Sequence, residues 1–439
     1  MVVGIIGLGY VGLTLGLSFA NKGVEVYGVE TDENIKAKLK QNKAHFLEDG
    51  IDALIEKVNN KTFHVVDAFE KGVHFDAFIV TVGTPLIGHD TKTPNFNYIL
   101  SALDTIEQVY DGTALVVLRS TVSVGTTTKF VLPRLAQMSG RPFKDVLLGF
   151  CPERTIEGKA LVELTSLPQI ISGNNKESIN RAKELFLKLT PKVVVADSLE
   201  EAELAKLYCN VYRDMTFAIG NAFCLAAQSL GVDGVKVIIR ANEGYPRSNI
   251  AQPGFVAGPC LEKDAHIMLN NMPESLSKNL IFSARTLNEG LEEMVCAYVR
   301  RILGAPDEKT IITMSGLAFK GRPETSDLRG SSAVYIAKTL HKLGYKLYLH
   351  DFVAKKEDME ALNVGTYVTT DKLSEACAQS KLLMVLNNHI KYCSLDFEDW
   401  VIQNGLRVLD VWNVCDRLHE RDDMITDTIG TINLETVKG

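Results

Sequence analysis

Residues 2–30 read VVGIIGLGYVGLTLGLSFANKGVEVYGVE, and this stretch decides the fold. A short β-branched run is followed by closely spaced glycines, by a segment of helical composition and by a second run of strand character. The turn between the first strand and the helix reads GLGYVG (7–12), a GxGxxG in the strand-to-helix context where the motif is informative. The sequence therefore predicts a βαβ unit that binds a dinucleotide.

Each glycine of this motif has a physical task. Gly7 allows a tight turn, Gly9 leaves bare backbone beside a pyrophosphate, and Gly12 permits close packing of the helix on the sheet. The helix N-terminus offers amide groups and a partial positive charge to the phosphates. Glu30 ends the second strand, where a carboxylate accepts hydrogen bonds from a ribose 2′-hydroxyl and repels a 2′-phosphate. NAD is therefore favoured over NADP, and FAD is less consistent with the thiol and lysine described below.

The composition is that of an ordinary globular protein. The 439 residues are 46% hydrophobic and 23% charged with a net charge of -7, which indicates two or three domains and argues against nucleic-acid or anionic-membrane partners. The N-terminus lacks the basic region of a signal peptide, and no apolar run is long enough to cross a bilayer. The eight cysteines include no CxxC pair, so we expect neither disulfides nor a metal site, and a reducing cytoplasm fits best.

Alternation of strand-like and helical segments predicts an α/β fold with two doubly wound, Rossmann-like domains. A proline-free stretch from residue 199 carries apolar residues at three- and four-residue spacing, which predicts a long central helix with two or more buried faces. Alternation returns after a linker near 304–307. The expected regions are a dinucleotide-binding domain (1–198), a central helical region (199–304) and a second Rossmann-like domain (305–439).

Two further stretches carry reactive or charged groups. GPCLEKDAH (258–266) places Cys260 in a turn beside charged residues, where a thiol either acts as a nucleophile or merely ends a loop. The first turn of the second α/β region contains Phe319, Lys320 and, further on, Arg329. Basic residues at a strand end suit an anionic ligand, although a solvated loop explains them equally well.

Seven segments together resemble the UDP-glucose/GDP-mannose dehydrogenase family of nucleotide-sugar 6-dehydrogenases, along essentially the whole chain. They are GLGYVG (7–12), VGTP (82–85), STV (120–122), CPERTIEGK (151–159), ELAKLYCN (203–210), PGFVAGPCLEKD (253–264) and GLAFKGRPETSDLRGSS (316–332). The resemblance implies an NAD-binding domain, a long central helix, a UDP-sugar-binding domain and a homodimer built on the helical region. It also implies oxidation of a sugar C6 alcohol to a carboxylate by two hydride transfers, through a thiohemiacetal and a thioester on Cys260.

The same resemblance assigns the remaining roles. By this resemblance, Lys206 stabilises an oxyanion, and Asn210 holds an intermediate or a water. Thr121 and Asp264 together position a water, and Glu153 takes part in thioester hydrolysis. The implied catalytic residues are Cys260, Lys206, Asn210, Asp264, Thr121 and Glu153. The implied cofactor residues are Gly7, Gly9, Tyr10, Val11, Gly12, Glu30, Thr84, Pro85, Thr121, Glu157 and Lys263. The implied substrate residues are Glu153, Arg154, Lys206, Asn210, Arg247, Phe255, Gly258, Phe319, Lys320 and Arg329, with Arg247 reaching the neighbouring subunit's substrate.

Two departures bear on function. The family loop before the cysteine usually reads G-x-G-G-x-C, whereas this chain has Pro259 directly before Cys260 and fewer glycines. CPERTIEGK resembles the UDP-N-acetylhexosamine (ManNAc or GlcNAc) enzymes, and LEKD resembles the UDP-glucose enzymes; we favour the former. Alternatives are a UDP-glucose 6-dehydrogenase, a two-electron alcohol dehydrogenase and a catalytically silent nucleotide-sugar-binding protein.

Overall fold

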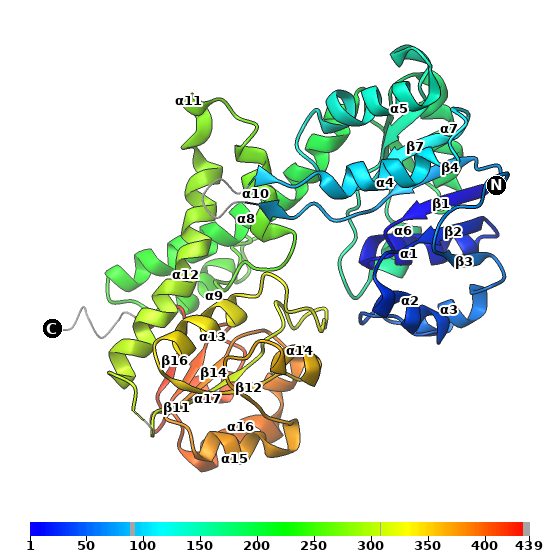
Figure 1. The fold of residues 1–439 in the computed structure, drawn as a ribbon. Coiled ribbons are helices and arrows are strands. Elements are labelled where there is room, and N and C mark those ends of the chain that lie inside the picture. The colour runs from blue at the N-terminus through cyan, green and yellow to red at the C-terminus, as the bar shows by residue number, and fades with distance from the viewer. Residues whose placement is uncertain (88–92, 308, 433–439) are drawn as a thin grey trace. The chain divides into compact units, whose positions relative to one another are not determined.

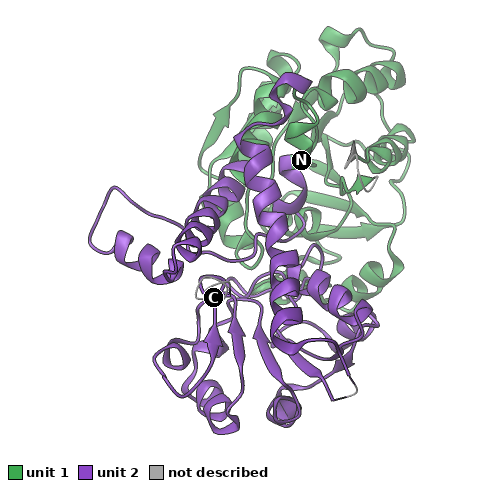
Figure 2. Ribbon diagram, turned by 90° about the vertical axis from the view of Figure 1, so that its left-hand side faces the viewer, with its two compact units in different colours: residues 1–210, 266–273 green, residues 211–265, 274–439 purple. Residues whose placement is uncertain are grey.

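A computed structural model describes residues 1–87, 93–307 and 309–432 (Figure 1). The chain divides into two compact units, coloured separately in Figure 2: unit 1 comprises residues 1–210 and 266–273, and unit 2 comprises 211–265 and 274 onward. Helices α8 (Leu199–Ser229) and α10 (Leu261–Leu269) each contribute residues to both units. The three-region division inferred from the sequence stays a prediction.

Unit 1 is built on an eight-stranded sheet of order β10-β9-β8-β7-β4-β1-β2-β3. Neighbouring strands are parallel except β8 and β9, which are antiparallel. The order reverses between β1 and β4, which is where doubly wound sheets bind ligands at their carboxyl ends. The strands are β1 (Val2–Ile6), β2 (Glu25–Val29), β3 (Phe63–Val66), β4 (Ala77–Val80), β7 (Leu115–Leu118), β8 (Leu148–Phe150), β9 (Gln169–Gly173) and β10 (Val193–Val195), with a separate hairpin of β5 (Leu86–Ile87) and β6 (Thr93–Pro94).

Alternate residues of these strands feed two hydrophobic cores. In β4, Ala77 and Ile79 belong to one core, and Phe78 and Val80 belong to the other. Burial on both faces explains why the strands read as continuous apolar runs. The first core is covered by α1 (Tyr10–Asn21), α3 (Ile51–Val58) and α7 (Lys176–Leu187), and the second by α4 (Asn97–Glu107) and α5 (Leu132–Ser139). Unit 1 also contains α2 (Glu33–Lys40), α6 (Ala160–Ser166) and a π-helical segment, η1 (Thr127–Val131).

Unit 2 repeats the same strand order on a smaller scale. Its six strands are all parallel in the order β13-β12-β11-β14-β15-β16, so the central strand β11 again stands beside the reversal. The second α/β half is therefore an echo of the first, as the sequence predicted. The strands are β11 (Ile311–Ser315), β12 (Lys346–His350), β13 (Thr366–Tyr367), β14 (Leu382–Val385), β15 (Val408–Asp410) and β16 (Thr426–Asp427).

Helices cover both faces of this second sheet. One core includes residues of α12 (Leu280–Leu303) and α13 (Ser332–Lys342), and the other includes residues of α15 (Leu373–Ala378) and α16 (Leu395–Asn404). In Figure 1 the long helix α12 rises well beyond the sheet. The remaining helices are α9 (Gly234–Asn242), α11 (Glu274–Ser277), α14 (Lys356–Glu360) and α17 (Asp416–His419). No helix in the described part of the chain is both long and apolar enough to span a membrane.

Helix α8 confirms the predicted long central helix. In addition to apolar residues, it buries a row of polar and charged side chains, which the sequence pattern did not indicate. Six polar side chains with at most 7% exposure follow one another along it: Glu203, Lys206, Asn210, Asp214, Asn221 and Gln228. Their spacings of three, four and seven residues keep them near one face of a helix. We call this set the polar row of α8.

Candidate functional site

The glycine turn of unit 1 lies at the carboxyl end of β1. Gly7 has a φ of +90°, and its amide donates to Val29 O at 2.9 Å. The Leu8 amide donates to Glu30 Oε2 at 2.7 Å, which places this carboxylate beside the turn. Glu30 Oε1 accepts from the amides of Thr31 and Asp32 at 2.7 and 3.0 Å, so its carboxylate is held in place.

The space around the turn fits a pyrophosphate. A Cβ on Gly12 would come 1.9 Å from Gly7 O, so only glycine lets α1 approach β1 this closely. A Cβ on Gly9 would meet no protein atom within 4 Å, so open space lies beside this bare backbone. The bare backbone at Gly9, the N-terminus of α1 and the Glu30 carboxylate are the groups that an NAD cofactor requires: amides for its pyrophosphate and an acceptor for its ribose hydroxyl.

Tyr10 of the motif is tied to the loop that carries Glu153 and Glu157. Its hydroxyl donates to Glu48, and the same carboxylate oxygen accepts from the Gly158 amide at 2.8 Å. Burial and the Glu48 carboxylate raise the pKa of Tyr10 well above its usual range, so the phenol stays protonated. Sequence reasoning missed Glu48, which is 5% exposed and stands in a stretch without a recognisable motif.

The segments after β4 and β7 are joined by two hydroxyl groups. Thr84 Oγ1 donates to Thr121 O at 2.5 Å, and Ser120 Oγ donates to Val82 O at 2.6 Å. The structure thus brings the predicted residues Thr84 and Thr121 together at the carboxyl edge of the sheet. Pro85 follows directly, and its carbonyl accepts from the Asn95 amide at 2.8 Å.

Glu153 lies in a fully hydrogen-bonded buried pair. Its Oε2 accepts from Nε and Nη2 of Arg119 at 3.1 and 2.5 Å, and its Oε1 accepts from the amides of Arg154 and Thr155 at 2.6 and 2.7 Å. Although burial opposes the charge, Arg119, the Thr155 amide and Lys206 keep the pKa of Glu153 below its usual value. The carboxylate is therefore a fixed negative charge near Lys206. Arg119, which the sequence analysis did not single out, is 2% exposed at the end of an apolar strand.

The first half of the polar row carries two of the predicted catalytic residues. Lys206 and Asn210 are four apart on α8, each 7% exposed, and lie on the same face as Glu203. The Arg154 guanidinium, by contrast, donates to Pro168 O at 2.5 Å.

In unit 2, Cys260 stands immediately before α10, and its side chain is exposed. Amide groups at a helix N-terminus favour negative charge, so this position suits a thiolate. One turn later, Asp264 is 1% exposed and pairs with Lys263 Nζ at 2.7 Å. Five other cysteines are buried, and burial raises the pKa of Cys151, Cys224, Cys296 and Cys377 to about 12.

Buried polar groups hold the backbone of the Cys260 loop. Arg285 of α12 donates to Val256 O at 3.2 Å and to Leu261 O at 3.1 Å, on either side of the cysteine. Asp214 of the polar row accepts from Arg285 Nη1 at 2.8 Å. Asn221 binds both the amide and the carbonyl of Gly254, at 2.9 and 3.1 Å. The backbone of the loop is therefore fixed to α8 and α12 by side-chain hydrogen bonds.

The Cys260 loop also packs against the predicted anion-binding turn. Gly258 has a φ of +97°, its amide donates to Gly330 O at 2.8 Å, and a Cβ there would come 2.5 Å from the Phe319 ring. Lys320 Nζ lies 5.3 Å from the centre of that ring. The structure thus brings Gly258, Phe319 and Lys320 together.

The other predicted substrate residues of unit 2 have separate surroundings. Phe255 is buried at 6% exposure, the Arg247 guanidinium lies 5.0 Å from the Tyr245 ring centre, and Arg329 pairs with Asp327 at 2.6 Å.

The first turn of unit 2 copies the backbone of the glycine turn of unit 1 but not its chemistry. The Gly316 amide donates to His350 O at 2.9 Å, as Gly7 does to Val29 O, and the Ala318 amide, one position further along the turn than Leu8 in unit 1, donates to Asp351 Oδ2 at 3.0 Å. Asp351 is only 7% exposed and also accepts from two further amides. Because α13 begins only at Ser332, the turn does not open a helix toward a pyrophosphate.

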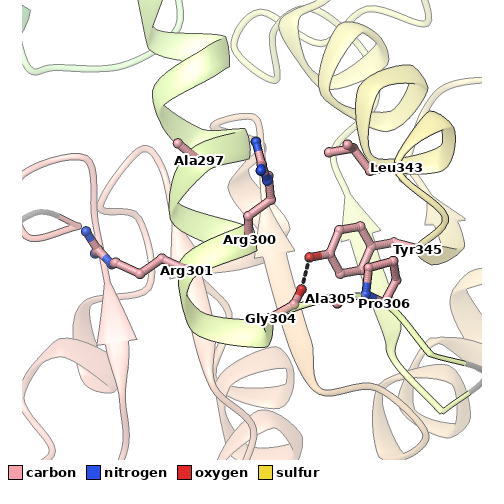
Figure 3. Close-up of a pocket in the computed structure, with 8 residues that line it drawn as sticks. All are labelled: Ala297, Arg300, Arg301, Gly304, Ala305, Pro306, Leu343 and Tyr345. Atoms are coloured by element: carbon pink, nitrogen blue, oxygen red, sulfur yellow. Dashed lines mark hydrogen bonds between the residues drawn. The ribbon is translucent and has the colours of Figure 1, made fainter.

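A surface pocket of unit 2 stands apart from these predictions. It is lined by Ala297, Arg300, Arg301, Gly304, Ala305, Pro306, Leu343 and Tyr345 (Figure 3). Tyr345 donates to Gly304 O at 2.5 Å, whereas Arg301 points away toward the Tyr298 ring, 5.6 Å from its centre. None of the residues predicted from the sequence lines this pocket.

Comparison with known proteins identifies the family of the chain. Residues 1–190, 200–290 and 313–417 match the NAD-binding, central and UDP-binding domains of the UDP-glucose/GDP-mannose dehydrogenase family. The chain is 30% identical to the UDP-N-acetyl-D-mannosamine dehydrogenase of Pyrococcus horikoshii over 91% of this chain and 92% of that one. It is 32% identical to the Campylobacter jejuni enzyme of the same name, over 76% and 81%. The solved structure of the Pyrococcus horikoshii enzyme superposes with a TM-score of 0.85 at 28% identity, covering 99% of this chain and 100% of that chain.

The same substitution, glycine to alanine, is expected to have different effects at Gly12 and at Gly9 of the motif. Gly12→Ala forces a backbone overlap and is expected to lower the free energy of unfolding by about 1–3 kcal/mol and to abolish NAD binding. Gly9→Ala meets no protein atom, so stability is expected to stay unchanged while NAD binding weakens. Chemical denaturation and calorimetric titration with NAD measure the two effects, and equal losses of stability in both variants would contradict this account.

Gly258→Ala tests the packing of the Cys260 loop on Phe319. The positive φ and the contact with the ring predict a loss of about 1–3 kcal/mol in stability and a raised KM for the nucleotide sugar. Gly244→Ala is the matched control, because Gly244 also has a positive φ, +64°, but a Cβ there would meet no atom within 4 Å. An unchanged KM in the Gly258 variant would show that the position of Phe319 for substrate binding does not depend on its contact with Gly258.

Proposed function

Because the chain belongs to the UDP-glucose/GDP-mannose dehydrogenase family, we propose that it oxidises C6 of UDP-N-acetylmannosamine to the uronate with NAD. The protein is an NAD-dependent nucleotide-sugar dehydrogenase; the choice of sugar is our proposal. Relatives named UDP-N-acetyl-D-mannosamine dehydrogenase, from both archaea and bacteria, support this choice. CPERTIEGK (151–159) supports it as well.

The reaction removes four electrons and needs a covalent step. NAD, held at the glycine turn by Gly7, Gly9, Gly12 and Glu30, would supply the acceptor for the hydride that leaves C6. The Cys260 thiolate adds to the resulting aldehyde, and the tetrahedral thiohemiacetal gives up the second hydride to form a thioester. Water cleaves the thioester, so that alcohol, two NAD⁺ and one water become carboxylate, two NADH and three protons. The observation that carries the proposal is the exposed Cys260 at the N-terminus of α10, one turn before the buried Asp264.

Residues of unit 1 supply the charge for this chemistry. The Lys206 ammonium is the group that stabilises the oxyanion of the tetrahedral species, and Asn210 is the neighbouring hydrogen-bonding group on the same helix face. Glu153 already accepts four hydrogen bonds, so we assign it the role of a fixed negative charge beside Lys206 rather than that of a proton acceptor. Thr121, together with Asp264, is the candidate for positioning the hydrolytic water.

Stoichiometry tests the reaction, and a panel of sugars tests the substrate. With UDP-ManNAc we expect two NADH per sugar and a uronate product by mass spectrometry, and at least tenfold lower kcat/KM with UDP-GlcNAc, UDP-GalNAc and UDP-glucose (on the order of one well-placed polar contact). A ratio of one NADH per sugar with an aldehyde product would identify a two-electron dehydrogenase. Binding of both ligands without NADH formation would identify a silent binding protein.

Cys260→Ser separates the two oxidations. The hydroxyl is a far weaker nucleophile than a thiolate at neutral pH, so we expect the overall rate of uronate formation to fall by at least about 10³-fold. NAD binding is expected to stay unchanged. Cys393→Ser, which changes another exposed cysteine of unit 2, is the matched control and is expected to retain parental turnover.

We further propose that the protein is a homodimer that associates through α8. Large apolar side chains stand exposed along this helix at four- and seven-residue spacing: Tyr208 (55%), Tyr212 (72%), Ile219 (50%) and Phe223 (52%). Such a stripe is the pattern of a helix that packs against another helix. Its continuity over most of the helix supports a self-association surface.

Charges on this stripe are expected to prevent association. Tyr212→Glu with Phe223→Glu is expected to convert the dimer to a monomer in light scattering coupled to size exclusion, because like charges in the interface repel one another and cannot pair across it. Phe143→Lys, at an equally exposed phenylalanine outside α8, is expected to leave the dimer intact. A parental monomer at micromolar concentration would overturn the proposal.

A further inference from the structure

The segment that follows Thr121 is held by hydrogen bonds to residues that are remote in sequence. Residues 121–127, here called the Thr121 turn, connect β7 to the π-helical segment η1. Thr84 fixes the first carbonyl of the turn at 2.5 Å. The far end contains Gly125 at a φ of +86° and the buried Thr127.

Glu203 of α8 accepts hydrogen bonds from this far end. Its Oε2 accepts from the Gly125 amide at 2.5 Å, and its Oε1 accepts from the amide and the hydroxyl of Thr127 at 2.8 and 2.6 Å. The side chain is 1% exposed. The carboxylate therefore caps the start of η1 from another part of the chain.

The position of Glu203 in the polar row links this contact to the reacting groups. Lys206 and Asn210 follow it by three and seven residues and share its helix face. Because the Glu203 carboxylate is hydrogen-bonded to the turn, it fixes the distance between Thr121 and these two side chains. Because α8 is a rigid element, the turn cannot move without breaking two backbone hydrogen bonds.

We propose that Glu203 is a positioning residue, which holds the Thr121 turn in register with Lys206 and Asn210 for the chemical steps. This inference rests on the proposed function, since that function gives Thr121, Lys206 and Asn210 their roles. Glu203 touches neither substrate nor cofactor in this role and acts only through the turn.

The burial of Glu203 makes the proposal testable. Exclusion of water raises the pKa of its carboxyl, while the hydrogen bonds from Thr127 and Gly125 partly oppose that rise. A neutral isostere therefore relieves the burial of charge while it removes acceptor capacity. A residue kept only for stability would show its effect in the thermal midpoint, whereas a positioning residue would show it in kcat.

Glu203→Gln is the decisive variant. We expect kcat to fall about ten- to hundredfold, as for a displacement of reacting groups by about 1 Å, with KM for the nucleotide sugar changed less than about twofold. The thermal midpoint is expected to stay within about 3 °C of the parent. Amide hydrogen exchange, read residue by residue, is expected to accelerate at Gly125 and Thr127 alone within unit 1.

Two further variants provide the controls. Glu200→Gln breaks only the 2.5 Å contact from the Thr128 hydroxyl, one turn earlier on the same helix, and is expected to leave kcat and both amide exchange rates unchanged. Thr127→Val removes one of the three hydrogen bonds to Glu203 and is expected to lower kcat about two- to fivefold. If Glu203→Gln proves unstable, Thr127→Val carries the test, since it retains both backbone contacts.

The outcomes separate this inference from the proposed function. Parental kcat in Glu203→Gln and Thr127→Val, or unchanged exchange at Gly125 and Thr127, overturns the inference. A parent that prefers another UDP-sugar overturns only the substrate assignment, and the kcat comparison is then made with that sugar. A parent that produces no NADH overturns both.

Discussion

The polar row of α8 is the constraint on which the rest of the structure depends. Each of five members binds or faces a segment remote in sequence: Glu203 the turn at 125–127, Lys206 the Glu153 loop, Asp214 the Arg285 side chain, Asn221 the backbone of Gly254, and Gln228 the carbonyl of Ile429. Buried polar groups must be hydrogen-bonded or paired, so these contacts are directional. Apolar packing alone would have tolerated small shifts of the helix.

The same principle explains how a loop with few glycines keeps its shape. Arg285 and Asn221 hold the backbone around Cys260, so Pro259 can restrict the loop without being its only support. In unit 1 the Arg119–Glu153 pair holds the loop after β8 in the same way. Both ions are buried, and both oxygens of the carboxylate accept hydrogen bonds. Fixed dipoles and charges need no reorganisation when charge develops on a substrate.

Local sequence patterns predicted the glycine turn, Glu30, the long helix and the repeated α/β order, because each depends on neighbours within one element. The family resemblance pointed to Cys260 and to the loop segments. Neither assigned a role to Arg119, Glu48 or Glu203, although Glu203 begins the segment ELAKLYCN. A carboxylate inside a helix, or an arginine after an apolar strand, usually faces water, and only the folded chain shows that these are buried with remote partners. The similarity between Asp351 and Glu30 was hidden for the same reason, since the signal lies in backbone geometry.

A long helix that carries so many directional contacts has little freedom to change length. Deleting one residue between Glu203 and Gln228 would rotate every later side chain by about 100° and shift it by about 1.5 Å along the axis. For a deletion between Asp214 and Gln228, the members beyond it would face the wrong segments of unit 2, and the exposed apolar side chains beyond it would turn with them. A change of one residue in length is therefore expected to destabilise the protein far more in α8 than in a surface loop.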